Sequence, residues 1–245
     1  MKLPRVMTIL DYLFPNFTCL ACRDELREAE QAHICNDCFG KIQRAKYPTN
    51  KAKNVLKLGK NDSGKDVKIW LDRVSAPFVY SSCSPISKMI RGLKYYSDGQ
   101  VAEALAPYMI PCLNILDYDM IIPIPLAKSR QRERGFNQAT KIAREVLNRS
   151  SISANIYEGI VIKTKSTTPQ VDMSTEQRLQ NQADAYSINQ EKLPYIKGKR
   201  ILIIDDVITS GATINEVARA LRKAGAKCVD ALAIARVGHQ QAKES

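Results

Sequence analysis

Apolar runs and amphipathic segments alternate along the chain from about residue 84. Apolar segments predict strands at residues 120–122, 201–204 and 229–235, and the continuous run 201–204 predicts a strand buried on both faces. Apolar positions three or four residues apart predict four helices: residues 84–95, 100–109, 137–148, and a segment after residue 213 that ends near Gly225. This order predicts an α/β fold with a doubly wound, mostly parallel sheet and ligands at the carboxyl ends of its strands.

Two acidic residues and a small-residue segment follow the strand predicted at 201–204. Asp205 and Asp206 come first, and residues 209–213 then lead into a helix. Unpaired N–H groups at a helix N-terminus attract anions, and two adjacent carboxylates suit the neighbouring hydroxyls of a ribose. The alternative is that the acids cap the helix, which explains one acidic residue but not two. The segment indicates a sugar-phosphate site.

The segment 201–213 resembles the phosphoribosyl pyrophosphate (PRPP) signature of type I phosphoribosyltransferases. This resemblance implies that Asp205 and Asp206 hold the ribose hydroxyls and that Mg²⁺ accompanies PRPP. It also implies that five residues bind the 5′-phosphate: Thr209, Ser210, Gly211, Ala212 and Thr213. Thr209 stands where purine-salvage members have an acid that serves the incoming base, which disfavours a purine-salvage assignment.

A cluster of cations follows the strand predicted at 120–122. It consists of Lys128, Arg130, Arg132 and Arg134. Charge runs of this kind are often solvated loops. Beside a pyrophosphate site, however, guanidinium groups would bind phosphate oxygens. We therefore predict that Arg130 binds pyrophosphate and that Arg134 does so as part of the catalytic set with Asp205 and Asp206.

The sequence Arg134-Gly135-Phe136-Asn137-Gln138 resembles the Arg-Gly-Phe-Asn-Gln motif of the ComF family, which includes the GntX group. Further positions resemble the family pattern: Tyr80, Leu93-Lys94-Tyr95, Gln170, Arg178, Asn181 and Tyr186. The resemblance runs from the N-terminal cysteines to about Arg236. It implies a role in natural transformation, in which the protein binds or acts on imported single-stranded DNA in the cytoplasm. It also implies a helicase-like competence ATPase as a partner.

Four cysteines near the N-terminus form two Cys-x2-Cys pairs: Cys19, Cys22, Cys35 and Cys38. Two such pairs can bind one structural Zn²⁺ through four thiolates. The alternative is two disulfides in a secreted domain. However, the apolar stretch 6–10 is too short for a signal peptide, and the total of 7 cysteines is odd. We predict a zinc ribbon in a cytoplasmic protein, since no apolar run approaches the ~20 residues of a membrane-spanning helix.

Residues 41–68 are rich in lysine, with a local charge of 9 − 2 = +7, in a chain of net charge +12. Two interpretations are open: a flexible, solvated linker, or an arm that binds nucleic-acid phosphates. Tyr47, Trp70, Tyr95 and Tyr96 are candidates for stacking on unpaired bases. The predicted organisation is a zinc ribbon at 1–40, a lysine-rich connector at 41–70 and a phosphoribosyltransferase-like domain at 71–245. Within this domain, residues 163–190 are predicted to form a loop or hood over the site.

Two functions from different classes remain open. The chain is either a DNA-uptake protein that keeps a PRPP pocket, or an enzyme that transfers ribose 5-phosphate from PRPP to an unknown nitrogen acceptor. The sequence identifies no general base, so turnover is left undecided. A PRPP-responsive repressor is a third possibility, but no segment has the pattern of a recognition helix.

Overall fold

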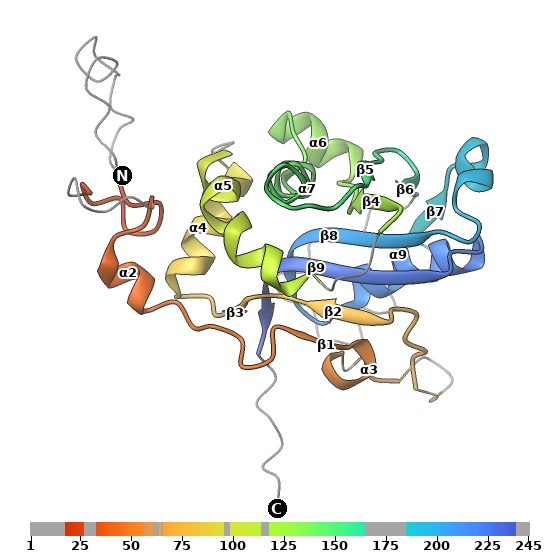
Figure 1. Cartoon of the computed structure of the whole chain (residues 1–245), viewed down its shortest axis with the longest axis horizontal. Helices are drawn as coiled ribbons and strands as arrows, with labels where there is room; N and C mark the ends of the chain where they lie inside the picture. Colours follow the sequence, from red (N-terminus) through yellow and green to blue (C-terminus); the bar gives the residue numbers. More distant parts are fainter. Residues whose placement is uncertain are drawn as a thin grey trace, which may run out of the picture.

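The computed structural model describes residues 18–26, 33–56, 58–60, 64, 66–95, 99–113, 118–164 and 185–238. A seven-stranded sheet forms its centre (Figure 1). The strands follow the spatial order β1 (Thr49–Lys51), β2 (Arg73–Ser75), β9 (Cys228–Val237), β8 (Arg200–Ile208), β4 (Met120–Pro123) and β5 (Asn155–Ile156), and β3 (Phe78–Tyr80) also pairs with β9. Every pairing in this sheet is parallel except β1 with β2. The predicted α/β fold with a mostly parallel sheet is confirmed.

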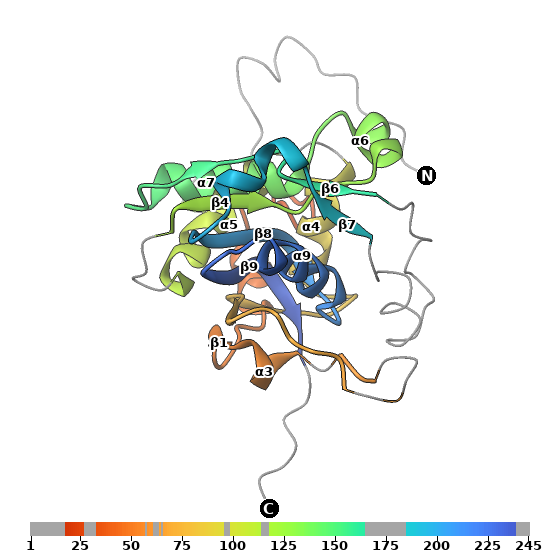
Figure 2. The ribbon, with the colours of Figure 1, turned by 90° about the vertical axis from the view of Figure 1, so that its right-hand side faces the viewer.

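Helices cover both faces of the sheet (Figure 2). On one face, α9 (Ala212–Lys223) and the short α3 (Ala52–Val55) share a core with β8 and β9. On the other face, α4 (Pro85–Tyr95), α5 (Gly99–Met109) and α7 (Gln138–Arg149) form a second core, which includes the buried Cys19 and Leu20. The predicted helices are confirmed to within two residues, because each has the amphipathic spacing that a two-layer core requires.

The strand with the two aspartates is longer than its apolar run predicts. β8 continues through Asp205 and Asp206 to Ile208, because β9 pairs with it over this whole length. On the other side, β4 pairs with β8 only as far as Pro123 opposite Ile204. The aspartates therefore lie inside a strand, at the point where one of its neighbours has ended.

The cation cluster after β4 is a helix and not a loop. Helix α6 spans Lys128–Arg134 and ends at Gly135, which has a φ of 74°. Other short elements are α2 (Asn36–Gly40), the 3-10 helices η1 (Ile110–Cys112) and η2 (Gln190–Tyr195), and the antiparallel pair β6 (Val161–Lys163) and β7 (Tyr186–Ile188). Residues 165–184 of the predicted hood, with Gln170, Arg178 and Asn181, lie outside the described residues. Within the described ranges, each helix is too short or too polar to span a lipid bilayer.

The lysine-rich segment packs against the α/β domain where it is described. β1 forms the outer strand beside β2, and α3 lies beneath it (Figure 1). Four apolar side chains of this segment are buried in the core with α9: Ala52, Val55, Leu56 and Leu58. The interpretation as a flexible, solvated linker is wrong for these residues. The domain division at residues 40 and 70 stays a prediction.

Asn215 on α9 fixes the end of this segment. Its side-chain oxygen accepts the Trp70 N–H at 2.8 Å, and its amide donates to the Lys68 carbonyl at 3.0 Å. Arg222, two turns later on the same helix, binds the Trp70 carbonyl at 3.4 Å and pairs with Asp72. Residues 68–72 are thus attached to α9 by side-chain hydrogen bonds that local sequence does not reveal.

Replacing Asn215 with alanine removes both hydrogen bonds to residues 68 and 70. Since the two backbone groups lose their partners, Asn215→Ala should lower the free energy of unfolding by about 1–2 kcal/mol. Urea unfolding followed by circular dichroism measures this difference. The exposed Asn148 on α7 provides the control, and Asn148→Ala should change stability by less than about 0.5 kcal/mol. Equal losses in the free energy of unfolding for the two substitutions would contradict a specific stabilising role of the Asn215 hydrogen bonds.

Candidate functional site

A cavity of about 260 Å³ opens at the carboxyl ends of β4 and β8. The chain proceeds from β4 to β5 on one side, whereas β8 and β9 lie on the other, so the strand order reverses here. Ligands of open α/β sheets bind at such reversals. Predicted site residues from two distant segments meet in the lining: Arg130, Arg134, Asp205, Asp206, Thr209, Gly211 and Thr213.

The two carboxylates are held in place by the backbone and by a lysine. Asp205 Oδ1 accepts the N–H of Asp206 at 2.8 Å, and Asp206 Oδ1 accepts the N–H of Val207 at 2.7 Å. Lys94, near the end of α4, forms an ion pair with Asp206, with 2.7 Å between Nζ and Oδ2. The Asp206 side chain is 7% exposed and that of Lys94 28%, so this ion pair is poorly screened by water.

Burial and mutual repulsion change the acidity of this cluster. Burial of the carboxyl group, and after it the charge of Asp206, raise the pKa of Asp205 to about 8. Burial acts to lower the pKa of Lys94, but the attraction of Asp206 and Asp205 outweighs it and raises that pKa. In the empty cavity, Asp205 therefore holds a proton near neutral pH while Lys94 stays charged.

The loop after β8 requires glycine at position 211. Gly211 has a φ of 83°, and a Cβ there would lie 2.5 Å from Leu56 Cδ2 of the lysine-rich segment. Helix α9 begins at the next residue, so its first N–H groups have no partner within the helix. Ser210 and Ala212 are buried and do not line the cavity; Ser210 Oγ accepts the Ala212 N–H at 3.3 Å. The loop has the form of an anion cradle.

The Arg-Gly-Phe-Asn-Gln segment joins two helices at the rim of the cavity. Asn137 caps α7 by accepting the Ala139 N–H at 2.9 Å and donates to the Ile124 carbonyl after β4, also at 2.9 Å. Arg134 donates to Gln138 Oε1 at 3.3 Å. This motif therefore aligns Arg134 with the end of β4. Arg132 is exposed and does not line the cavity.

Lys94, Lys163 and Tyr186 also line the cavity, although the sequence gives none of them a functional role. Lys94 and Tyr186 match positions of the family pattern, and Lys163 and Tyr186 come from β6 and β7. Lys163 Nζ lies 5.5 Å from the centroid of the Tyr186 ring. Burial, with the charge of Arg130, lowers the pKa of Lys163. The Leu-Lys-Tyr match was the available signal for Lys94.

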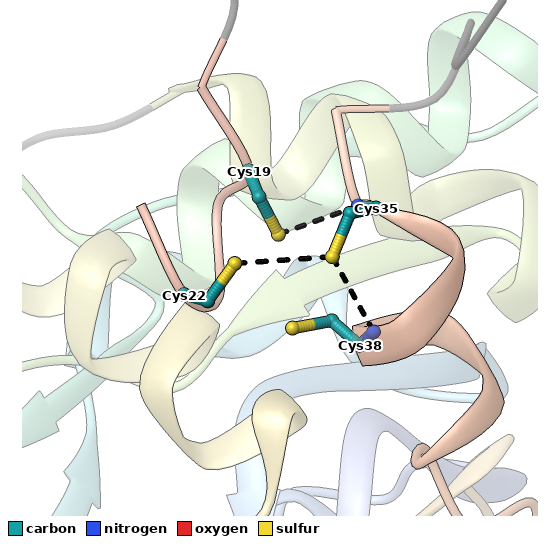
Figure 3. A group of neighbouring side chains, drawn as sticks. All are labelled: Cys19, Cys22, Cys35 and Cys38. Atoms are coloured by element: carbon teal, nitrogen blue, oxygen red, sulfur yellow. Dashed lines mark hydrogen bonds between the residues drawn. The ribbon is translucent and has the colours of Figure 1, made fainter. Parts of the chain in front are cut away.

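The four N-terminal cysteines come together as predicted (Figure 3). Their sulfur atoms all lie within 4.8 Å of one another, so the cluster could hold a metal ion. Backbone N–H groups of Ala21 and Cys35 donate to Cys19 Sγ at 3.4 and 3.3 Å. Burial acts to raise the pKa of Cys19, but hydrogen bonds from the backbone of Cys22, Cys35 and Ala21 outweigh it and lower that pKa to about 7, which favours a thiolate.

Comparison with known protein families agrees with the α/β fold described above. Residues 132–245 match the family model described as "Phosphoribosyl transferase domain". Together with the mostly parallel sheet and the cavity at its carboxyl edge, this match defines the α/β unit as a phosphoribosyltransferase domain of type I.

Named relatives cover more of the chain. Competence protein F of Haemophilus influenzae is 29% identical over 234 residues, which are 91% of this chain and 98% of the relative. DNA utilization protein YhgH of Shigella flexneri is 30% identical over 161 residues, 62% and 67% of the two chains. Competence protein ComFC of Streptococcus pneumoniae is 23% identical over 207 residues, 83% and 87%. The chain belongs to the ComF family.

The raised pKa of Asp205 predicts a pH dependence of stability. An unfolded Asp titrates near ~3.9, whereas folded Asp205 titrates at about 8. Between these values the folded state binds a proton that the unfolded state has released, so the free energy of unfolding falls as pH rises. Asp205→Asn removes this contribution and can keep the bond to the Asp206 N–H. The variant should therefore gain stability relative to wild type from about pH 5 to pH 8.

Urea unfolding at closely spaced pH values measures this difference. Above about pH 8 the gain should reach a plateau, because Asp205 is then ionised in both states. Glu158→Gln, at an exposed acid outside the cavity, should show no such trend. A difference between Asp205→Asn and wild type that does not depend on pH would contradict the perturbed carboxyl group.

Proposed function

We propose that this chain serves DNA uptake in natural transformation and binds PRPP with Mg²⁺ in the cavity between β4 and β8. In this proposal, the protein works in the cytoplasm on imported single-stranded DNA. The observation that carries the PRPP assignment is the meeting of two acids, an anion cradle and two arginines in one cavity. The names of the relatives, competence protein and DNA utilization protein, support the biological role.

The roles of the residues follow from their chemistry. Asp205 and Asp206 are acceptors for the ribose hydroxyls, and the loop 209–213 binds the 5′-phosphate through N–H and hydroxyl donors. Arg130 and Arg134 on α6 bind the pyrophosphate as guanidinium forks. Lys94 holds the Asp206 side chain through their ion pair before the ligand arrives, and its position near Arg134 suits a phosphate oxygen.

The metals implied by these sites have different roles. Mg²⁺ would enter with PRPP and neutralise pyrophosphate charge, and the carboxyl oxygens of Asp205 and Asp206 are ligands of the kind that Mg²⁺ prefers. At the cysteines, we propose a structural Zn²⁺. Sulfurs bound to zinc at ~2.3 Å in a tetrahedron lie about 3.8 Å apart. The 3.8 Å between Cys22 Sγ and Cys35 Sγ supports this assignment and is too long for a disulfide.

Loss of both acids tests PRPP binding. In Asp205→Ala/Asp206→Ala the ribose hydroxyls lose both carboxyl acceptors, so affinity for PRPP with Mg²⁺ should fall about 100-fold or more. Isothermal titration calorimetry measures the affinity. In a transformable host that depends on this gene, the same variant should give fewer transformants. Glu158→Gln, at an exposed acid, should match wild type in both assays.

Two results would contradict the proposal. Wild-type protein that gives no heat with PRPP, with or without Mg²⁺, would exclude the PRPP site. Normal transformation by the double variant would show that DNA uptake does not require the cavity. A third result would favour an enzyme unrelated to DNA. In that case the wild-type protein releases pyrophosphate from PRPP in the presence of a nitrogen acceptor, and the double variant does not affect transformation.

Metal analysis tests the zinc assignment. The purified protein should contain about one Zn²⁺ per chain, and Cys22→Ser should retain about a tenth of it or less because one of four ligands is lost. Elemental analysis gives the metal content, and thermal unfolding should show a lower midpoint for the variant. Cys83→Ser, at an exposed cysteine outside the cluster, should keep full zinc. Wild-type protein free of zinc and equally stable after chelation would contradict the site.

The partner implied by the family remains a proposal as well. A helicase-like competence ATPase would need to act on the same DNA strand, and co-purification from competent cells would detect it. This partner is a consequence of the proposed role in DNA uptake.

A further inference from the structure

The outer strand of the sheet presents a group of cations beside an exposed aromatic ring. We define the β1-edge surface as Lys46, Tyr47, Lys51, Lys53, Asn54 and Arg73. Lys51 lies directly opposite Arg73 in the antiparallel register of β1 and β2. Like charges at such opposed positions repel one another. An anion between them would therefore be bound favourably.

A shallow depression lies at this pair of cations. Its lining consists of hydroxyl, amide and cationic side chains: Thr49, Asn50, Lys51, Asn54 and Arg73. Two acids lie nearby. Asp72 pairs with Arg222 and accepts the Val229 N–H. The buried Asp230, opposite Arg73 in the register of β2 and β9, accepts the Tyr118 hydroxyl at 2.8 Å and offsets part of the Arg73 charge. Residues 41–60 contain no aspartate or glutamate. The depression has the composition of a phosphate site.

Tyr47 lies two residues before the depression in the chain, and its ring is exposed. The side chain is 51% exposed, whereas the backbone carbonyl is held by Arg236 at 3.2 Å and by the Asn50 amide at 3.3 Å. Lys46 Nζ lies 5.4 Å from the ring centroid. An exposed ring on a fixed backbone loses little freedom on stacking, and an unpaired base offers the face that it needs.

We propose that the β1-edge surface binds single-stranded DNA, with Tyr47 stacked on a base and its lysines and Arg73 on phosphates. The proposal rests on the proposed role in DNA uptake and names the face that serves it. A single strand fits better than a duplex, because a duplex does not expose base faces to a side chain. The site is separate from the cavity, whose lining contains none of these residues.

Fluorescence anisotropy with a labelled oligothymidylate tests the proposal on the full chain. Lys46→Gln/Lys51→Gln/Lys53→Gln should weaken binding and reduce the slope of log affinity against log salt by about 2, since each lost phosphate contact contributes ~0.7. Tyr47→Ala should lower affinity about tenfold and leave the slope unchanged. All these side chains are exposed, so thermal unfolding should match wild type.

The chain offers a matched control on η2. Tyr195 is 60% exposed and Lys192 Nζ lies 5.8 Å from its ring, but Glu191 precedes this lysine. Lys192→Gln/Tyr195→Ala should leave affinity and salt slope unchanged. Effects of the control equal to those of the β1-edge variants would overturn the proposal.

Other outcomes separate this proposal from the proposed function. If both β1-edge variants bind single-stranded DNA as tightly as wild type does, the DNA must bind elsewhere on the protein. This result would overturn the proposal for the β1-edge surface and leave the proposed function intact. Tighter binding of duplex than of single strand would also overturn the proposal for this surface. If wild type binds no single-stranded DNA but gives normal heat with PRPP, the proposal for the β1-edge surface is wrong, whereas the proposal of a PRPP cavity is supported.

Discussion

Unequal pairing on the two sides of β8 creates the cavity. β9 pairs with β8 up to Ile208, whereas β4 ends at Pro123 opposite Ile204. The backbone at Asp205 and Asp206 is therefore fixed from one side while the other side is open. Two carboxylates placed there repel each other, and Lys94 compensates part of that repulsion through its ion pair with Asp206. Binding groups are thus ordered before a ligand arrives, which reduces the entropy lost on binding.

The α/β fold and much of this site could be predicted from sequence because the relevant signals are local. Apolar runs mark buried strands, and Asp205, Asp206 and Gly211 lie in one short segment. Lys94 could not be placed in this way. It belongs to α4, far from the acids in the sequence, and it reaches Asp206 only because α4 packs on the sheet. Tertiary packing of this kind has no periodic signal in the chain.

The lysine-rich segment shows how composition can hide a packing pattern. Its charge suggests a solvated linker, yet Ala52, Val55 and Leu56 have the spacing of one helix face and are buried. Lys53 between them stays exposed, so the mean composition reports the surface and not the core. The hydrogen bonds of Asn215 with residues 68 and 70 add a long-range constraint that no local window contains.

The same segment connects the two sites physically. Lys51 and Lys53 lie on the β1-edge surface, and Leu56, a few residues later, packs against the loop at Gly211. If a phosphate bound in the cavity shifted the loop 209–213, the loop would press on Leu56. The Leu56 side chain packs closely against Gly211, so no gap between them could take up the shift of the loop. Coupling free energies between two binding sites are reciprocal. Any coupling through Leu56 would therefore act in both directions: DNA on the β1-edge surface would change the affinity of the cavity by the same factor as the cavity's ligand changes the affinity for DNA.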